Sequence, residues 1–283
     1  MNDTLVIGSN PVQHQQKPKP RSPVTIIVGI VCEGVIILAS DSQTTSGTAK
    51  CEDARKITEL IFSDGKKALV AQAGAVTLSA RVVEIMEKLA TKTPLSDYRA
   101  VADLATTAMR ELKLELCRQN LDCTMEELHN WLRRGELECE LMLAHYFNGK
   151  PYLFTISLSI GIANRAGSHY VAIGCGGNLA RYLLSEHLPA NADRQLGYAI
   201  GVYTVENVKR HDAYCGGPTR IAAIYQFDGD VEFLKQSQID EFEKAISVED
   251  ERTKIERNQS FNRAMLDISN KQIQEWLRAF DDL

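Results

Sequence analysis

Two apolar runs near the start of the chain place the strongest constraint on its fold. Val24–Cys32 is rich in β-branched side chains, Glu33-Gly34 has the composition of a turn, and a second apolar run covers Val35–Ser40. β-Branched residues favour strands, and a short turn between two strands indicates a hairpin. Neither run alternates apolar with polar residues, so we expect both faces of this hairpin to be buried, or nearly so.

Beyond this hairpin, strand and helix periodicities alternate in groups. Further strands are predicted over Lys56–Phe62, Ala68–Ala73, Leu137–Tyr146, Pro151–Leu158, His169–Ile173, Arg220–Phe227 and Val231–Leu234. Helices are predicted over Val76–Leu89, Asp97–Gln119, Asn178–His187 and Ala190–Lys209, with a short one opened by a capping box at Thr124–Glu127. Strand groups alternating with helix groups predict an α+β fold, a four-layer αββα sandwich with two sheets enclosed by helices.

Composition divides the chain into three segments. Residues 1–24 are polar and contain four prolines, which predicts a flexible tail or a propeptide. The layered domain is expected over residues 25–236, followed by a helical C-terminal extension over 237–283. Apolar residues from Phe261 to Phe280 form a partial helical stripe, which fits either packing on the same subunit or an interface with a partner.

Several classes of function are not expected from the composition. The net charge is −5 with no long basic run, so no nucleic-acid partner is indicated. No apolar stretch reaches the roughly 18 residues needed to span a membrane, since the longest, Val24–Ser40, is broken by Glu33 and Gly34. The seven cysteines are odd in number and lack CxxC spacing, which predicts reduced thiols, a cytoplasmic location and no metal site. No cofactor is expected.

Five stretches, in order along the chain, carry a resemblance to one family. They are the hairpin residues Thr25–Ile30 with Gly34–Gly47, then Lys56-Ile57, Ala73-Gly74, Ala172–Gly177 and Asp212–Gly217. Together they resemble proteasome β subunits and HslV, the bacterial peptidase that partners an ATPase ring; both are N-terminal-nucleophile hydrolases. The resemblance implies a threonine-type peptidase in a homo-oligomeric ring, a polypeptide or peptide substrate and a possible ATPase ring partner.

The resemblance makes Thr25 the nucleophile. A threonine hydroxyl is a poor nucleophile until a base takes its proton. In this family the base is the threonine's own α-amine, whose pKa of about 8 suits proton exchange near neutral pH. An amide nitrogen lacks this basicity, so Thr25 is expected to act only after residues 1–24 have been removed.

Six further residues match positions of the family's active site. Lys56 matches the essential lysine, whose charge would lower the pKa of the amine, and Asp41 matches the carboxylate that fixes this lysine. Gly74 matches the glycine whose backbone N–H faces the developing oxyanion. The residues expected beside the amine are Cys175, Asp212 and Cys215. The family usually has serines at both cysteine positions, and a thiol is the weaker hydrogen-bond partner.

Other interpretations remain open at this point. Active members of the family usually have glycine before the nucleophile, whereas this chain has Val24, whose β-branched side chain would crowd the carbonyl that Thr25 attacks during self-cleavage. The chain is therefore also consistent with a non-catalytic ring or scaffold subunit. An amidase or a ligase with a narrower substrate would share the chemistry up to the acyl-threonine. Finally, Gly174–Gly177 is compatible with a nucleophilic elbow that carries Cys175.

Overall fold

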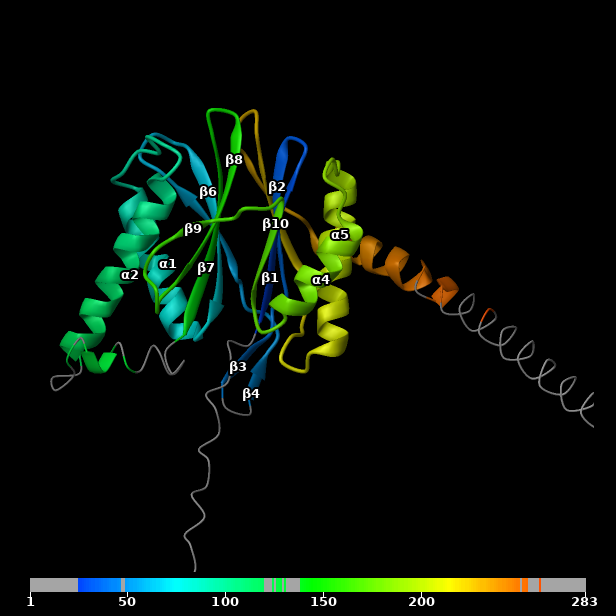
Figure 1. The fold of residues 1–283 in the computed structure, drawn as a ribbon, viewed down its shortest axis with the longest axis horizontal. Helices are drawn as coiled ribbons and strands as arrows, with labels where there is room; N and C mark the ends of the chain where they lie inside the picture. The colour runs from blue at the N-terminus through cyan, green and yellow to red at the C-terminus, as the bar shows by residue number, and fades with distance from the viewer. Residues whose placement is uncertain are drawn as a thin grey trace, which may run out of the picture.

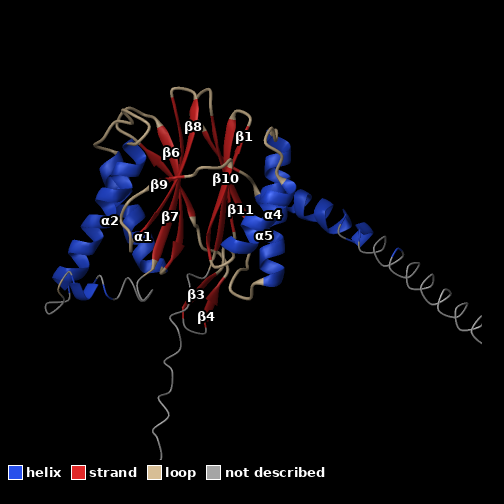
Figure 2. Cartoon of the chain, in the orientation of Figure 1, coloured by secondary structure: helices blue, strands red, loops and turns tan. Residues whose placement is uncertain are grey.

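The computed structural model describes residues 25–46, 49–119, 124, 126–128, 130, 138–249, 251–253 and 260. Two β-sheets stand face to face at the centre, and helices cover the outer face of each sheet (Figure 1). Figure 2 shows the strands as an inner block between two helical layers. The α+β, four-layer αββα sandwich expected from the sequence is confirmed.

The first sheet contains the hairpin that constrained the fold. Its strands follow the order β10-β1-β2-β11-β12, and all neighbours are antiparallel. Their bounds are Ile26–Cys32 for β1, Val35–Ser40 for β2, Tyr170–Gly174 for β10, Arg220–Tyr225 for β11 and Val231–Phe233 for β12. In β1 and β2 almost every residue is buried, because one face meets the second sheet and the other meets helices. The expectation of burial on both faces is confirmed.

The second sheet follows the strand order β5-β6-β7-β8-β9, also antiparallel throughout. Its strands are β5 (Ile57–Ile61), β6 (Lys67–Gly74), β7 (Cys139–Phe147), β8 (Lys150–Ser157) and β9 (Asn164–Arg165). The turn between β7 and β8 contains Asn148 and Gly149, both with positive φ, as the Asn-Gly pair predicted. A separate small hairpin, which the sequence analysis did not anticipate, joins β3 (Thr44–Ser46) to β4 (Ala49–Cys51).

Each sheet has its own pair of helices. On the second sheet lie α1 (Val76–Ala90) and α2 (Ala100–Gln119), and on the first lie α4 (Gly177–His187) and α5 (Arg194–His211). Two helices begin later than expected. Asp97 accepts a hydrogen bond from the backbone of Arg99 in a turn, which delays α2 to Ala100. Asp193 caps α5 by accepting from Leu196, so this helix begins at Arg194 rather than Ala190.

Two further segments bear on the sequence predictions. The capping box is confirmed: the Glu127 carboxylate accepts from the Thr124 backbone at 2.8 Å, and the Thr124 hydroxyl accepts from the Glu127 backbone at 3.2 Å. After β12 a helix covers 236–249, and its residue Ile239 is fully buried in the apolar layer between the first sheet and its helices. The predicted stripe from Phe261 to Phe280 lies outside the described residues. Among the described helices, none combines the length and apolar character needed to cross a bilayer.

Candidate active site

Three chain segments meet at one end of the space between the two sheets. Thr25 immediately precedes β1, and Asp41 immediately follows β2. Because β1 and β2 are antiparallel, with Ile27 opposite Ser40, these two residues lie together at the same end of the hairpin. Lys56 precedes β5 on the facing sheet and reaches across to both. The strand order therefore joins residues that are 15 to 31 positions apart in the sequence.

Asp41 is the centre of the hydrogen bonding. Its Oδ1 atom accepts from the Thr25 hydroxyl at 2.6 Å, from the Ile26 backbone at 3.1 Å and from Lys56 Nζ at 2.6 Å. Its Oδ2 atom accepts from the backbone of Gly216 at 3.1 Å. The Asp41 side chain is wholly buried, so these four donors replace the water that a buried carboxylate would otherwise require.

Lys56 brings a positive charge to the Thr25 hydroxyl. Its Nζ donates to Thr25 Oγ1 as well as to Asp41, and the side chain is only 5% exposed. Burial lowers the pKa of Lys56 below its usual value, while the neighbouring Asp41 carboxylate opposes that shift. A cation in contact with the hydroxyl oxygen favours loss of the hydroxyl proton, and this is the chemical requirement for a threonine nucleophile.

The residues expected beside the amine also meet at Thr25. They lie at its backbone nitrogen, whereas Lys56 contacts its hydroxyl. Cys175 Sγ lies 3.3 Å from both the Thr25 nitrogen and the Thr25 carbonyl oxygen, and 3.6 Å from Cys215 Sγ. A hydrogen bond from Cys215 lowers the pKa of the Cys175 thiol, and the same contact raises that of Cys215. Ligand atoms of Asp212 and of both cysteines all lie within 4.8 Å of one another.

The alternative of a cysteine nucleophile at an elbow does not match the surroundings of Cys175. The residue does lie at a strand-turn-helix junction, since β10 ends at Gly174 and α4 begins at Gly177. Its sulfur, however, faces the backbone of Thr25 and the thiol of Cys215. A nucleophilic cysteine needs a general base at this position, whereas the geometry makes Cys175 a neighbour of the Thr25 nitrogen.

Gly74 ends β6 and lines the same small cavity as Thr25. Its φ is +106°, and a Cβ built there would stand 2.4 Å from the Glu138 carbonyl oxygen, so glycine is required both for conformation and for space. Helix α1 begins two residues later, which directs the positive end of the helix dipole toward this corner. Negative charge developing near Gly74 would be stabilised there.

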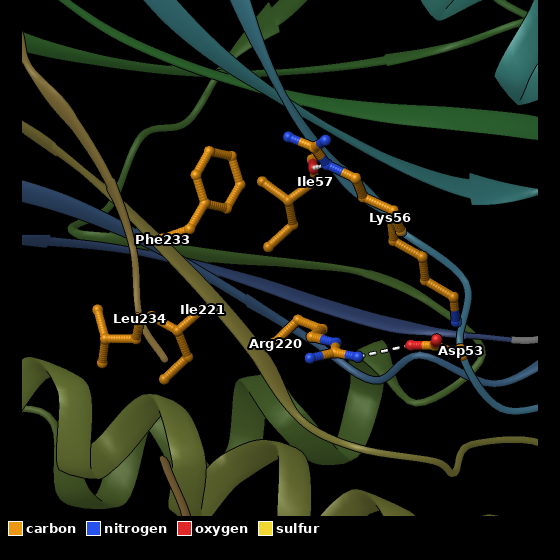
Figure 3. A pocket seen from close by; sticks show the side chains of 8 residues that line it. Asp53, Lys56, Ile57, Arg220, Ile221, Phe233 and Leu234 are labelled. Carbon is orange, nitrogen blue, oxygen red and sulfur yellow. Dashed lines mark hydrogen bonds and ion pairs between the residues drawn. The ribbon is translucent and has the colours of Figure 1, made fainter. Parts of the chain in front are cut away.

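Two cavities flank Lys56. The smaller, of about 50 Å³, is lined by Thr25, Gly74 and polar residues such as Gln72. The larger, of about 500 Å³, opens between β5 and β11, and its lining includes Lys56, Phe233 and the Arg220–Asp53 ion pair (Figure 3). Lys56 lines both cavities.

Sequence reasoning missed two contributors to the site. Gly216 had been included in the Asp212–Gly217 stretch only for its resemblance, yet its backbone N–H is a direct donor to Asp41. Glu140, on β7, accepts from the backbone of Gly174 at 3.2 Å and thereby links the facing sheet to the segment that carries Cys175. A backbone donor has no residue signature, and the packing of β7 across from β10, which belongs to the other sheet, cannot be read from either strand alone.

Comparison with known proteins shows the family of the chain. A sequence model described as proteasome subunit matches residues 24–224, from the residue before Thr25 to the last part of β11. The chain belongs to the proteasome subunit family. The family resemblance drawn from the five sequence stretches is therefore confirmed, and so is the N-terminal-nucleophile hydrolase fold. Among curated proteins, none matches the chain.

Solved proteasome-like structures share the fold at low sequence identity. Anbu (Gly-1) mutant from Hyphomicrobium sp. strain MC1 has a TM-score of 0.64 at 16% identity, covering 81% of this chain and 96% of its own. Anbu (ancestral beta-subunit) from Yersinia bercovieri has a TM-score of 0.62 at 17% identity, covering 78% and 92%. A helical assembly of the Anbu complex from Pseudomonas aeruginosa has a TM-score of 0.63 at 15% identity, covering 81% and 96%.

Proposed function

We propose that this proteasome-family chain is a threonine-type peptidase that uses Thr25 as its nucleophile once residues 1–24 have been removed. The observation that carries the proposal is the contact of one hydroxyl with both a buried lysine and a buried aspartate. A threonine that precedes a strand has no structural need for such a pair. Burial of two charges is costly, and here they converge on a hydroxyl at the edge of a cavity.

The proposed reaction starts with a proton transfer from Thr25 Oγ1 to the freed α-amine. Lys56 stabilises the resulting oxyanion-like nucleophile, and Asp41 holds Lys56 in position. Oγ1 attacks the substrate carbonyl, and the negative charge on the carbonyl oxygen is stabilised near the Gly74 N–H. The protonated amine then gives its proton to the leaving nitrogen as the peptide bond breaks. Water, deprotonated by the same amine, hydrolyses the acyl-threonine.

The residues around the Thr25 nitrogen have a supporting role in this proposal. Cys175, Asp212 and Cys215 would accept or donate hydrogen bonds to the α-amine and hold its lone pair toward Oγ1. Because sulfur forms weaker hydrogen bonds than oxygen, this orientation is less firmly fixed than hydroxyl groups would make it. The proposed peptidase would therefore act with an α-amine whose orientation is less firmly fixed.

The proposed setting is a ring of identical subunits in the cytoplasm that acts on polypeptides or peptides, with a possible ATPase ring partner. Membership of the proteasome subunit family supports self-assembly, and a structure similar to this chain is described as a helical assembly. The nucleic-acid and membrane partners that the composition argued against form no part of this proposal.

A non-catalytic ring or scaffold subunit is the second candidate, and Val24 favours it. Removal of residues 1–24 by self-cleavage requires attack on the Val24 carbonyl, and a β-branched side chain crowds that carbon. Conversely, a scaffold subunit has no need of the Lys56–Asp41 pair. An amidase or a ligase would use the same residues and differ only in whether water or an amine takes the acyl group.

Hydrolysis of a panel of fluorogenic peptides separates these candidates. We expect cleavage by the wild-type chain, no cleavage above background by Thr25→Ala, and reduced but measurable cleavage by Thr25→Ser, which keeps a hydroxyl. Full activity in Thr25→Ala would refute the peptidase proposal. Inactivity of all three proteins on every peptide would favour the scaffold, and transfer to added amines in place of water would favour the ligase.

A further inference from the structure

The side chains around the Thr25 nitrogen also form a set of metal-ligand atoms. Cys175, Asp212 and Cys215 offer two sulfurs and a carboxylate oxygen, all within 4.8 Å of one another. Within the described part of the chain, no second cluster of three such ligands is found. The three residues come from the β10–α4 junction and the loop after α5, so sequence spacing gave no indication of them.

We propose that these three residues bind one zinc ion and that the freed α-amine of Thr25 completes the coordination sphere. The bound amine can then no longer act as a base. The first half of the proposal concerns metal binding and stands on geometry alone. The second half rests on the proposed function, because the amine must be the base for its capture to inhibit hydrolysis.

The distances between the donor atoms suit a tetrahedral ion. Zinc–sulfur bonds of about 2.3 Å place two thiolates about 3.8 Å apart at the tetrahedral angle. Cys175 Sγ and Cys215 Sγ are already 3.6 Å apart. A nitrogen ligand would stand about 3.6 Å from either sulfur, and the Thr25 nitrogen is 3.3 Å from Cys175 Sγ. Rotation of the Asp212 side chain then supplies the fourth corner.

The chemistry of the donors selects zinc over harder cations. Two thiolates with one carboxylate and one amine form the soft-to-borderline set that zinc prefers, whereas magnesium and calcium require oxygen ligands throughout. Cys175 is half-buried and Cys215 is buried, so the site excludes most water yet remains reachable from the Cys175 side.

Binding is a ligand exchange without oxidation or reduction. Each thiol loses its proton to solvent as a zinc–sulfur bond forms. The sulfurs and the carboxylate replace water molecules bound to the ion, and these waters return to the solvent. In the processed chain the α-amine donates its lone pair to zinc. That pair then cannot accept the Thr25 hydroxyl proton, so the nucleophile stays protonated until a chelator removes the ion. In the unprocessed chain the nitrogen is an amide, and water takes the fourth position.

Titration of the full chain with Co²⁺, a spectroscopic substitute for zinc, tests the binding directly. We expect one ion per chain, sulfur-to-cobalt charge transfer in the near ultraviolet, and visible bands typical of a tetrahedral ion. Cys175→Ser and Cys215→Ser should each weaken the charge-transfer band, and the double variant should lose it. Cys51→Ser, which changes an exposed cysteine, is the matched control and should leave the spectrum unchanged. No charge-transfer band, or one retained by the double variant, would overturn the site.

Zinc inhibition tests the second half separately. Peptide hydrolysis by the processed chain should fall on addition of zinc and return with a chelator, and the double cysteine variant, at whatever rate it retains, should be insensitive to zinc. Inhibition of the double variant to the same degree would overturn the regulatory claim. A chain that binds Co²⁺ as expected but hydrolyses no peptide would contradict the peptidase proposal and leave the metal site supported. Protection of Cys175 from alkylation by zinc, measured by peptide mass, checks binding in the wild-type chain without a spectroscopic signal; equal alkylation with and without zinc would overturn the site.

Discussion

The space between the two sheets is filled in two contrasting ways. At its middle, apolar side chains from both sheets interlock, among them Leu38, Leu69 and Met142, all fully buried. At one end, the equally buried positions are held by Thr25 and by the Lys56–Asp41 ion pair. Burial is thus the same in the two regions, and only the chemistry differs.

This contrast separates what holds the sheets together from what the protein does with them. The apolar middle gains free energy from removal of surface from water. The polar end must offset the desolvation of two charges, and it does so through the hydrogen bonds that converge on Asp41. A buried ion pair is weak evidence of stabilisation, so its presence beside a hydroxyl supports the proposed role of this end in catalysis.

The largest effect is expected from removal of the cation at the polar end. Lys56→Met keeps the length of the side chain but takes the charge away from Thr25 Oγ1, and we expect peptide hydrolysis to fall by about 10³-fold. Lys113→Met is a matched control, since Lys113 is a buried lysine on α2 and burial also lowers its pKa. Steady-state rates should show a large loss in the first variant and little change in the second; equal losses would mean that Lys56 acts only through stability.

The next effect compares the two regions in stability. Asp41→Asn leaves the Lys56 charge buried without its carboxylate, and we expect the free energy of unfolding to fall by about 3–5 kcal/mol. Met142→Ala opens a cavity in the apolar middle and should cost about 2–5 kcal/mol. Urea denaturation measures both. Hydrolysis should survive in folded Met142→Ala and not in Asp41→Asn; the reverse pattern would contradict the division of roles.

A buried titratable group without an ion pair sharpens the comparison. His145 is fully buried between the second sheet and its helices, stacks on Tyr152, and bonds the Tyr98 carbonyl through Nε2 at 3.0 Å. Burial lowers the pKa of His145 from 6.5 to about 4. Between these pH values the unfolded chain binds the proton and the folded chain does not, so the stability is complete above pH 6.5 and falls as pH drops toward 4.

The slope expected from His145 is about 1.4 kcal/mol per pH unit, or about 3 kcal/mol over the window from pH 6.5 to 4. Urea denaturation at a series of pH values between 7 and 4 measures it, with His145→Phe as the variant that cannot titrate. The wild type should lose more stability toward low pH than His145→Phe. If the free energies of unfolding of the two proteins fall in parallel with pH, this histidine is not the cause of the loss of stability at low pH.

The smallest effect concerns two glycines on the first sheet and its helix. A Cβ at Gly29 on β1 would stand 2.6 Å from the Met142 sulfur, whereas at Gly201 on α5 the nearest atom would be 3.5 Å away, in ordinary contact. Gly29→Ala should therefore cost about 1–3 kcal/mol through overpacking, and Gly201→Ala should be neutral or gain up to about 1 kcal/mol from helix propensity. Thermal unfolding should give clearly different changes in Tm for the two variants. Similar changes would show that the side chains between the sheets can rearrange to accommodate the extra methyl group.

Much of the fold could be predicted because local pattern and tertiary environment agree. The β1–β2 hairpin, buried on both faces, has β-branched residues at most positions, and α1 keeps a regular apolar stripe. The αββα order followed from the order of these patterns. Among site residues, Thr25, Asp41 and Lys56 were predicted from the family resemblance, and the structure brings them into contact.

What escaped prediction depends on contacts between distant segments. The backbone of Gly216 donates to Asp41 although 175 residues separate them, and no spacing rule connects the ends of β2 and α5. The late start of α5 depended on which of several polar residues became its cap, and Asp193 was not singled out. Each strand of the β3–β4 hairpin is three residues long, which is too short for a periodic pattern to be recognised.

The intact mass of the purified chain tests the central claim most directly. If Thr25 is an N-terminal nucleophile that frees itself, the wild-type protein should have lost residues 1–24, and Thr25→Ala should keep them. A Val24→Gly variant should be processed faster, because it removes the β-branched side chain from the carbonyl under attack. A full-length mass for wild type and Val24→Gly alike would contradict the account, because the Thr25 nitrogen would still be an amide and could not serve as the base.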